Sequence, residues 1–241
     1  MTRDTIFSDS ETRSGGFEFN EAVARVFPDM LQRSIPGYGQ TIEAIGMLAR
    51  RHVQANSDCY DLGCSLGAAT LAMRHGIREE GCRIVAVDNA QAMVERCTAL
   101  VAADDAKTPV DVVLARLQDI AIDNASMVVM NYTLQFLPPA ERAAAIARVA
   151  NGLLPNGVFV LSEKVVDDDD DFDQYLIDLH HDFKRRNAYS ELEIARKRAA
   201  IENVLIPETV ATHIARLKNA GFRHAGVWLR WFNFVSFLAV R

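Results

Sequence analysis

The residues whose types and spacing point most clearly to a chemical role form a short run, D-L-G-C-S-L-G at 61–67, directly after the apolar pair Cys59-Tyr60. Its two glycines, Gly63 and Gly67, suit a sharp strand-to-helix turn where the backbone passes close to a ligand. Asp61 falls where the strand would end. The spacing Asp-x-Gly-x-x-x-Gly differs from the Gly-x-Gly-x-x-Gly fingerprint of pyrophosphate-binding loops. The run predicts a loop that holds a nucleotide-type cofactor.

A second acid, Asp88, ends the next β-branched run at 83–88. In a nucleotide-binding βαβ unit, an acid at the tip of the second strand accepts hydrogen bonds from the two ribose hydroxyls. Asp88 and Asn89 could instead cap the helix expected from Gln91, and both roles can hold together. The spacing at 61–67 resembles the first motif of class I S-adenosylmethionine-dependent transferases, whose ligand has no phosphate to cradle.

The elements that must position these residues alternate along the chain. Strands are expected at 59–61, 84–88, 110–114, 127–131 and 158–162, with helices at 68–79, 91–104 and 138–153. Such alternation requires right-handed crossovers and a parallel sheet. After a helix at 207–220, aromatic-rich strands at 225–231 and 233–240 close the sheet as an antiparallel edge hairpin. We expect an α/β, Rossmann-like class I methyltransferase fold, with a mostly parallel seven-stranded sheet and helices on both faces.

Composition and net charge limit the kinds of molecule that the protein is expected to bind. The 241 residues are 49% hydrophobic, which is enough for one buried parallel sheet, so we expect a single domain over 1–241. The net charge of −6 argues against a broad phosphate-binding footprint, and a small substrate is favoured over direct nucleic acid binding. Without a signal sequence or a membrane-spanning run, the protein is expected to be cytoplasmic. The four cysteines form no Cys-x-x-Cys pair, so neither a disulfide nor zinc is expected.

Two segments extend a minimal transferase core: an N-terminal helical extension at 1–56 and a helical insertion at 163–205. Residues 2–16 are expected to be irregular, followed by short helices at 20–27 and 28–33 and an amphipathic helix at 38–52. The insertion begins with five consecutive aspartates at 167–171, which favour a solvated turn or a helix N-terminus over a metal site.

The insertion also carries histidines and a basic run. His180 and His181 are adjacent, which does not match the i, i+4 spacing of a helical zinc pair, so at least one is expected to be structural. The basic run at 184–186 is more typical of a surface cluster than of an anion site. No metal is expected in this protein.

The chain resembles, nearly end to end, the bacterial carboxy-S-adenosyl-L-methionine synthases that act in wobble-uridine modification of transfer RNA. Long blocks outside the glycine loop carry this resemblance, and they separate the family from ordinary methyltransferases. The blocks are 26–30, 32–38, 60–70, 124–129, 133–137, 161–164, 180–184 and 189–194.

This resemblance implies a reaction in which S-adenosyl-L-methionine gains a carboxyl group on its methyl carbon. Prephenate would be the donor and phenylpyruvate the other product. A sulfonium acidifies its methyl group, so proton loss gives an ylide that can capture carbon dioxide, and confinement keeps the fragments together. The resemblance further implies a homodimer whose product, carboxy-S-adenosyl-L-methionine, passes to a tRNA carboxymethyltransferase. Prephenate is the expected small-molecule partner, and no membrane is involved.

Family ligand positions transfer onto the matching residues of this chain. Arg198 resembles the arginine that grips the new carboxylate, a role that suits a planar guanidinium because it can donate two parallel hydrogen bonds. It is expected to act in its own site or in that of a neighbouring subunit. The residues that resemble cofactor contacts are Tyr38, Gly63, Cys64, Ser65, Asp88, Asn89 and Asn131.

One stretch departs from the family. Gly-Asp and an aliphatic residue usually follow the third strand, whereas this chain has Ala115-Arg116-Leu117. An arginine cannot accept the adenine amino proton, but Leu117 can still offer its backbone N–H, and Gln118 or Asp119 could replace the acid. Cofactor binding is therefore expected to survive with rearranged adenine contacts, and Arg116 and Leu117 are assigned to the site by position.

Two other functions remain open from the sequence. A conventional small-molecule methyltransferase would use the same cofactor loop. A noncatalytic cofactor-binding module could instead dock onto a tRNA-modifying enzyme through 184–186 and 228–231. Turnover without a partner or RNA separates the second alternative from an enzyme.

Overall fold

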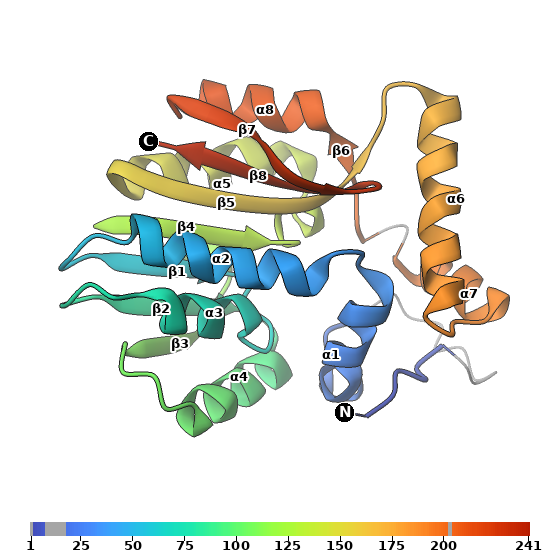
Figure 1. The fold of residues 1–241 in the computed structure, drawn as a ribbon, viewed down its shortest axis with the longest axis horizontal. Coiled ribbons are helices and arrows are strands. Elements are labelled where there is room, and N and C mark those ends of the chain that lie inside the picture. Colours follow the sequence, from blue (N-terminus) through green and yellow to red (C-terminus); the bar gives the residue numbers. More distant parts are fainter. Residues whose placement is uncertain (1, 8–17, 202–203) are drawn as a thin grey trace.

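The computed structural model describes residues 2–7, 18–201 and 204–241, and its framework is one mixed sheet (Figure 1). The strands run in the order β3 (Val110–Leu114), β2 (Arg83–Asp88), β1 (Asp58–Leu62), β4 (Ala125–Asn131), β5 (Leu153–Val166), β8 (Phe234–Val240) and β7 (His224–Trp231). The first five are parallel; β8 runs antiparallel to both of its neighbours, β5 and β7, so β7 points the same way as the first five. A short strand, β6 (Glu208–Thr209), pairs with the end of β5. The expected fold and edge hairpin are confirmed.

Both faces of the sheet are buried because successive side chains of each strand point to opposite sides. On one face Met127 and Val129 of β4 pack with Ile45 and Met73, from α2 (Tyr38–His52) and α3 (Ala68–Gly76). On the other face the intervening Val128 packs beneath α5 (Pro139–Gly152) and α8 (Val210–Asn219). Helix α4 (Gln91–Ala103) covers β2 and β3 on the α3 side. The sheet is thereby a rigid platform whose strand ends are fixed in space.

Three helices gather beyond the carboxyl ends of the parallel strands. Helices α6 (Asp170–Arg186) and α7 (Glu191–Ile201) lie at the right of Figure 1, with α1 (Glu21–Ser34) beside them. The aspartate run starts α6, as expected: the Asp169 side chain accepts from the backbone N–H groups of Asp171 and Phe172. Three further aspartates lie in its first turn and three basic residues in its last, which favours the helix dipole.

Several boundaries differ from the prediction. Instead of two short helices, α1 is continuous with Pro28 inside it. Its buried face, which includes Val23, Phe27 and Met30, packs tightly enough to outweigh the lost hydrogen bond at Pro28. Strand β5 begins at Leu153 rather than at residue 158, because the segment expected to be a turn already pairs with β4 through a register shift.

Residues 8–16 of the irregular segment expected at 2–16 lie outside the part of the chain that the structure describes. The same holds for residues 202–203 of the expected insertion. Within the described ranges, no helix combines the length and the apolar character that a bilayer crossing requires.

Candidate functional site

The glycine loop joins β1 to α3 at the carboxyl edge of the sheet. The N–H groups of Gly63 and Cys64 donate to the Val87 carbonyl of β2, at 2.8 and 2.9 Å. Gly63 has φ +85°, and a Cβ there would collide with the Thr133 side chain. Gly67, with φ +83°, directly precedes α3. Both glycines are required by the backbone path, as expected from their spacing.

The two acids of the loop region are held by hydrogen bonds. Asp61 is buried and accepts from Thr70 Oγ1 at 2.6 Å, and burial raises its pKa to about 6. Asp88 accepts from the N–H groups of Ser65 and Ala90, both at 2.9 Å, and burial raises its pKa. A carboxylate has about four lone-pair positions, so Asp88 can support the loop and still accept from a ligand.

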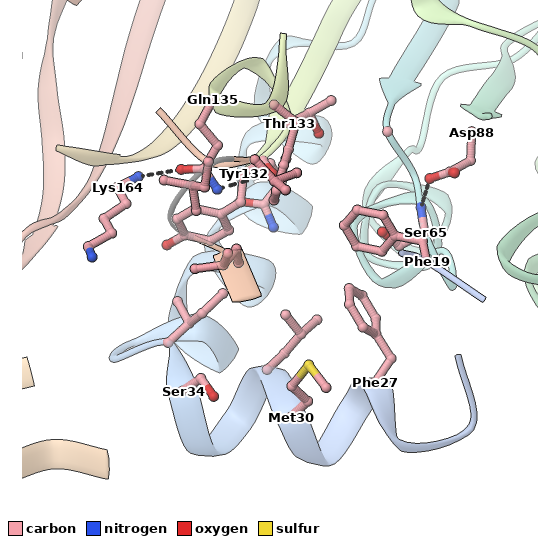
Figure 2. Close-up of a pocket in the computed structure, with 18 of the residues that line it drawn as sticks. Phe19, Phe27, Met30, Ser34, Ser65, Asp88, Tyr132, Thr133, Gln135 and Lys164 are labelled. Carbon is pink, nitrogen blue, oxygen red and sulfur yellow. Dashed lines mark hydrogen bonds between the residues drawn. The ribbon is translucent and has the colours of Figure 1, made fainter. Parts of the chain in front are cut away.

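A cavity of about 600 Å³ opens between this edge of the sheet and helices α1, α6 and α7. Figure 2 shows part of its lining. All ten residues assigned to the site from the sequence line this one cavity: Tyr38, Gly63, Cys64, Ser65, Asp88, Asn89, Arg116, Leu117, Asn131 and Arg198. The structure thus brings together residues from both added segments and from four strand ends, although their individual ligand contacts stay predictions.

Two of these residues carry polar groups that burial removes from solvent. Asn131 lies at the tip of β4, and its buried Oδ1 has no hydrogen-bond partner among the described residues. A buried, unsatisfied carbonyl oxygen costs free energy, so it marks a position where a donor of a ligand fits. Tyr38 starts α2, and its pKa is raised by burial and by the charge of nearby Asp61.

The opposite side of the cavity is cationic. Lys164 follows the core of β5, Lys184 lies on α6, and Lys197 and Arg198 lie on α7. Burial and the neighbouring cations lower the pKa of Lys184 to about 7. Burial and Arg198 also lower the pKa of Lys164. Figure 2 shows Lys164 on the side of the cavity away from Asp88, with Tyr132 between them.

One network of contacts fixes the helices behind this cationic wall. Arg33 of α1 donates to the carbonyls of Asn187 and Ala188, at 2.7 and 2.8 Å, and lies over the Tyr189 ring, 3.9 Å from its centroid. The Tyr189 hydroxyl donates to Asp4 at 2.5 Å. We call Asp4, Arg33, Ser34 and Tyr189 the anchor. It joins the start of the chain to the α6–α7 connection.

His180 belongs to the same wall. Its Nε2 donates to the Ser34 carbonyl at 2.8 Å, and burial lowers its pKa well below the usual value. It is therefore a neutral, structural histidine, which confirms that at least one of the pair is structural.

The prediction of a surface cluster at 184–186 is wrong for Lys184. Arg185 and Arg186 are exposed, but the Lys184 side chain is buried and lines the cavity. The missed signal is the i, i+4 spacing of Leu176, His180 and Lys184, which form the buried face of α6. Lys164 was also missed as a site residue, although it stands one position after the buried Glu163 at a strand end.

The remaining assigned residues differ in exposure. Cys64 is buried, and it packs with Ala86 and Cys97, so a contact between its backbone and a ligand stays a prediction. All four cysteines are free and buried. Arg116 and Asn89 are exposed at the cavity rim, whereas Leu117 is buried.

Comparison with known proteins places these features in a family. A family model described as a methyltransferase domain matches residues 60–157. An O-methyltransferase family protein from Burkholderia thailandensis shares the fold, with a TM-score of 0.64 and 14% identity, covering 92% of this chain and 59% of that one.

Two curated relatives are both named carboxy-S-adenosyl-L-methionine synthase. The Aliivibrio fischeri (strain MJ11) protein is 54% identical over 99% of this chain and 98% of its own length. The Salmonella newport (strain SL254) protein is 55% identical over 99% of this chain and 97% of its own. The chain belongs to the carboxy-S-adenosyl-L-methionine synthase family.

Proposed function

We propose that this protein converts S-adenosyl-L-methionine and prephenate into carboxy-S-adenosyl-L-methionine and phenylpyruvate. The observation that carries the proposal is the full-length identity of 54 to 55% with synthases of that name. The gathering of Arg198 and the cofactor-loop residues around one cavity supports it independently.

The acidic end of the cavity suits the cofactor. Gly63 lets the loop backbone turn at φ +85° close beside the Thr133 side chain, and Asp88 keeps lone pairs for two ribose hydroxyls. The unpartnered Oδ1 of Asn131 fits the amino acid or sulfonium end of the same molecule. In this proposal the backbone N–H of Leu117 meets the adenine, and Arg116 supplies no acceptor.

The reaction balances without another reactant. The sulfonium acidifies the methyl group of the cofactor, and a carbon–carbon bond forms between that carbon and the carboxyl group that prephenate loses. The proton from the methyl group and the hydroxide from the prephenate ring leave together as water. The residues of this chain bind, orient and confine the reactants, and Arg198 receives the new carboxylate by paired hydrogen bonds.

The finer expectations from the family resemblance belong to the same proposal. They are a homodimer, no metal, a cytoplasmic location and delivery of the product to a tRNA carboxymethyltransferase. No direct binding of nucleic acid is needed, in keeping with the net charge of −6.

Mass spectrometry provides the test. Purified protein is acid-extracted and the released ligand weighed, then the protein is incubated with S-adenosyl-L-methionine and prephenate without RNA. We expect carboxylated cofactor and an equal amount of phenylpyruvate. Recovery of only ordinary cofactor, with no carboxylated product, overturns the proposal. Methyl transfer to an acceptor would identify a conventional methyltransferase, and dependence on a second protein would identify a noncatalytic module.

A further inference from the structure

The cavity is divided by charge. Among the described residues that line it, the only carboxylates are Asp61 and Asp88, both at the glycine-loop end and both hydrogen-bonded there. Four cationic side chains, Lys164, Lys184, Lys197 and Arg198, line the part formed by β5, α6 and α7, whereas a fifth, the exposed Arg116, lies at the rim after β3.

These cations differ in whether the protein itself neutralises them. Lys197 donates to Ser34 Oγ at 2.7 Å and lies 3.8 Å from Asp4, so it belongs to the anchor side of the wall. Lys164 Nζ and Lys184 Nζ form no hydrogen bond or ion pair within the described part of the chain. The charge of Asp173 acts on Lys164 by raising its pKa. The Oδ1 atom of Asp173, however, accepts a hydrogen bond from the Asp167 N–H and not from Lys164.

Buried lysines are normally paired, because a desolvated charge without a partner destabilises the fold. Lys184 is only 8% exposed and faces further cations, since Lys164, Lys197 and Arg198 each oppose its protonation. His180 and His181 of its own helix add no negative charge. Two lysine side chains that the described chain leaves without an anionic partner indicate a ligand that brings negative charge with it.

We propose that Lys164 and Lys184 form the anion site for the dicarboxylate co-substrate, while Arg198 holds the carboxylate that ends up in the product. This division rests on the proposed function, in which prephenate carries two carboxylates and phenylpyruvate keeps one. The carboxylate that stays on the keto acid remains on the lysines throughout. The acidic end, in contrast, receives the cationic cofactor, so each reactant meets the opposite charge.

Kinetics of Lys164→Met and Lys184→Met test this assignment. Methionine keeps most of the length and apolar contact of lysine while removing the charge. We expect KM for prephenate to rise about tenfold or more in each variant, because a hydrogen bond to a charged group is lost. The dissociation constant for S-adenosyl-L-methionine should stay within about twofold, since no new charge is added near the cofactor. Inhibition by phenylpyruvate should weaken in parallel with KM.

Lys218→Met is the matched control, because Lys218 is exposed near the end of α8 and does not line the cavity. Lys184→Arg, which keeps the charge, should recover most of the lost affinity for prephenate. An unchanged KM, or an equal loss of affinity for cofactor and prephenate, overturns the anion site.

The two proposals fail in different ways. If the wild-type protein makes no carboxylated product, the proposed function fails. Calorimetric titration of prephenate into cofactor-loaded wild-type and variant protein still tests the lysines: equal affinities refute the anion site, and weaker binding by the variants supports it.

Discussion

The two ends of the cavity are built by different means. The glycine-loop end is made from backbone geometry at strand tips, and its acids are already hydrogen-bonded without a ligand. The other end is made from side chains on helices added to the core, and its lysines Lys164 and Lys184 remain without partners in the described chain. The acids of one end are held by hydrogen bonds within the protein, whereas the two lysines of the other end have no anionic partner in the described chain.

Because of this contrast, one end indicates which cofactor the protein binds and the other indicates which second reactant it accepts. Any transferase that uses the same cofactor can share the glycine-loop end, because backbone geometry at a strand tip builds it. In the proposed assignment, the cationic end selects the second reactant and so distinguishes one reaction from another. Variants at the two ends should therefore separate cofactor affinity from co-substrate affinity.

Gly63→Ala should give the largest effect, on the cofactor end. A side chain there combines strain at φ +85° with a collision against Thr133. We expect cofactor affinity to fall about 100-fold, measured by calorimetry. Gly39→Ala in α2 is the control: a Cβ added at Gly39 would have no other atom within 4 Å, so affinity should be unchanged and stability about 0.5–1 kcal/mol higher. Near-normal binding by Gly63→Ala would remove the argument for a pre-formed loop.

Arg198→Ala should come next and act on the other end. Loss of a charge-assisted hydrogen-bond donor is expected to weaken carboxy-S-adenosyl-L-methionine binding about tenfold or more. Plain S-adenosyl-L-methionine should bind within about twofold of wild type. Arg185→Ala, on an exposed arginine that pairs with Asp182 and Glu191, is the control. Equal losses for the two cofactor forms would exclude selective recognition of the carboxylate.

A smaller effect is expected from Lys184 on the stability of the ligand-free protein. Burial and nearby cations lower its pKa from 10.5 to about 7, so between these pH values the unfolded chain binds more protons than the folded one. The free energy of unfolding should therefore rise with pH across that interval. Lys184→Met should flatten this rise and add at least about 1 kcal/mol of stability at pH 7, measured by urea unfolding. A steeper rise in the variant would contradict the burial of an unpaired charge.

Arg116→Asp should have the smallest effect, at the rim of the cofactor end. An aspartate, which the family resemblance leads one to expect there, supplies an acceptor for the adenine amino group, and we expect cofactor affinity to improve a few-fold. Arg116→Ala separates the two contributions, because it removes the cation without adding an acceptor. Equal gains from both variants would mean that the acceptor has no role.

Much of the fold and of the cofactor end could be predicted from local patterns. The two glycines and the acid at the strand tip are close in sequence, so their spacing alone restricts the backbone path. Alternating strands and helices likewise predicted the parallel sheet and its antiparallel edge. The error at Pro28 arose because tertiary packing of α1 outweighs a local helix-breaking signal.

The cationic end was harder to predict because it depends on contacts between distant segments. Lys184 sits among three consecutive basic residues, and composition alone favours a solvated face for such a run. Only the packing of α6 against α1 shows which of the three turns inward. Arg198 was found by family resemblance, since nothing in its immediate neighbours distinguishes it from a surface residue.

The anchor has a consequence for the order of folding. Arg33 and Asn187 are 154 positions apart, so their contact closes a loop that spans most of the chain. Closing such a loop costs more entropy than pairing β1 with β2, whose contacts are local, and long-range contacts form slowly. We therefore expect the strands around the glycine loop to acquire amide-exchange protection first during refolding. The wall that admits the second reactant would be completed last, when the start of the chain docks.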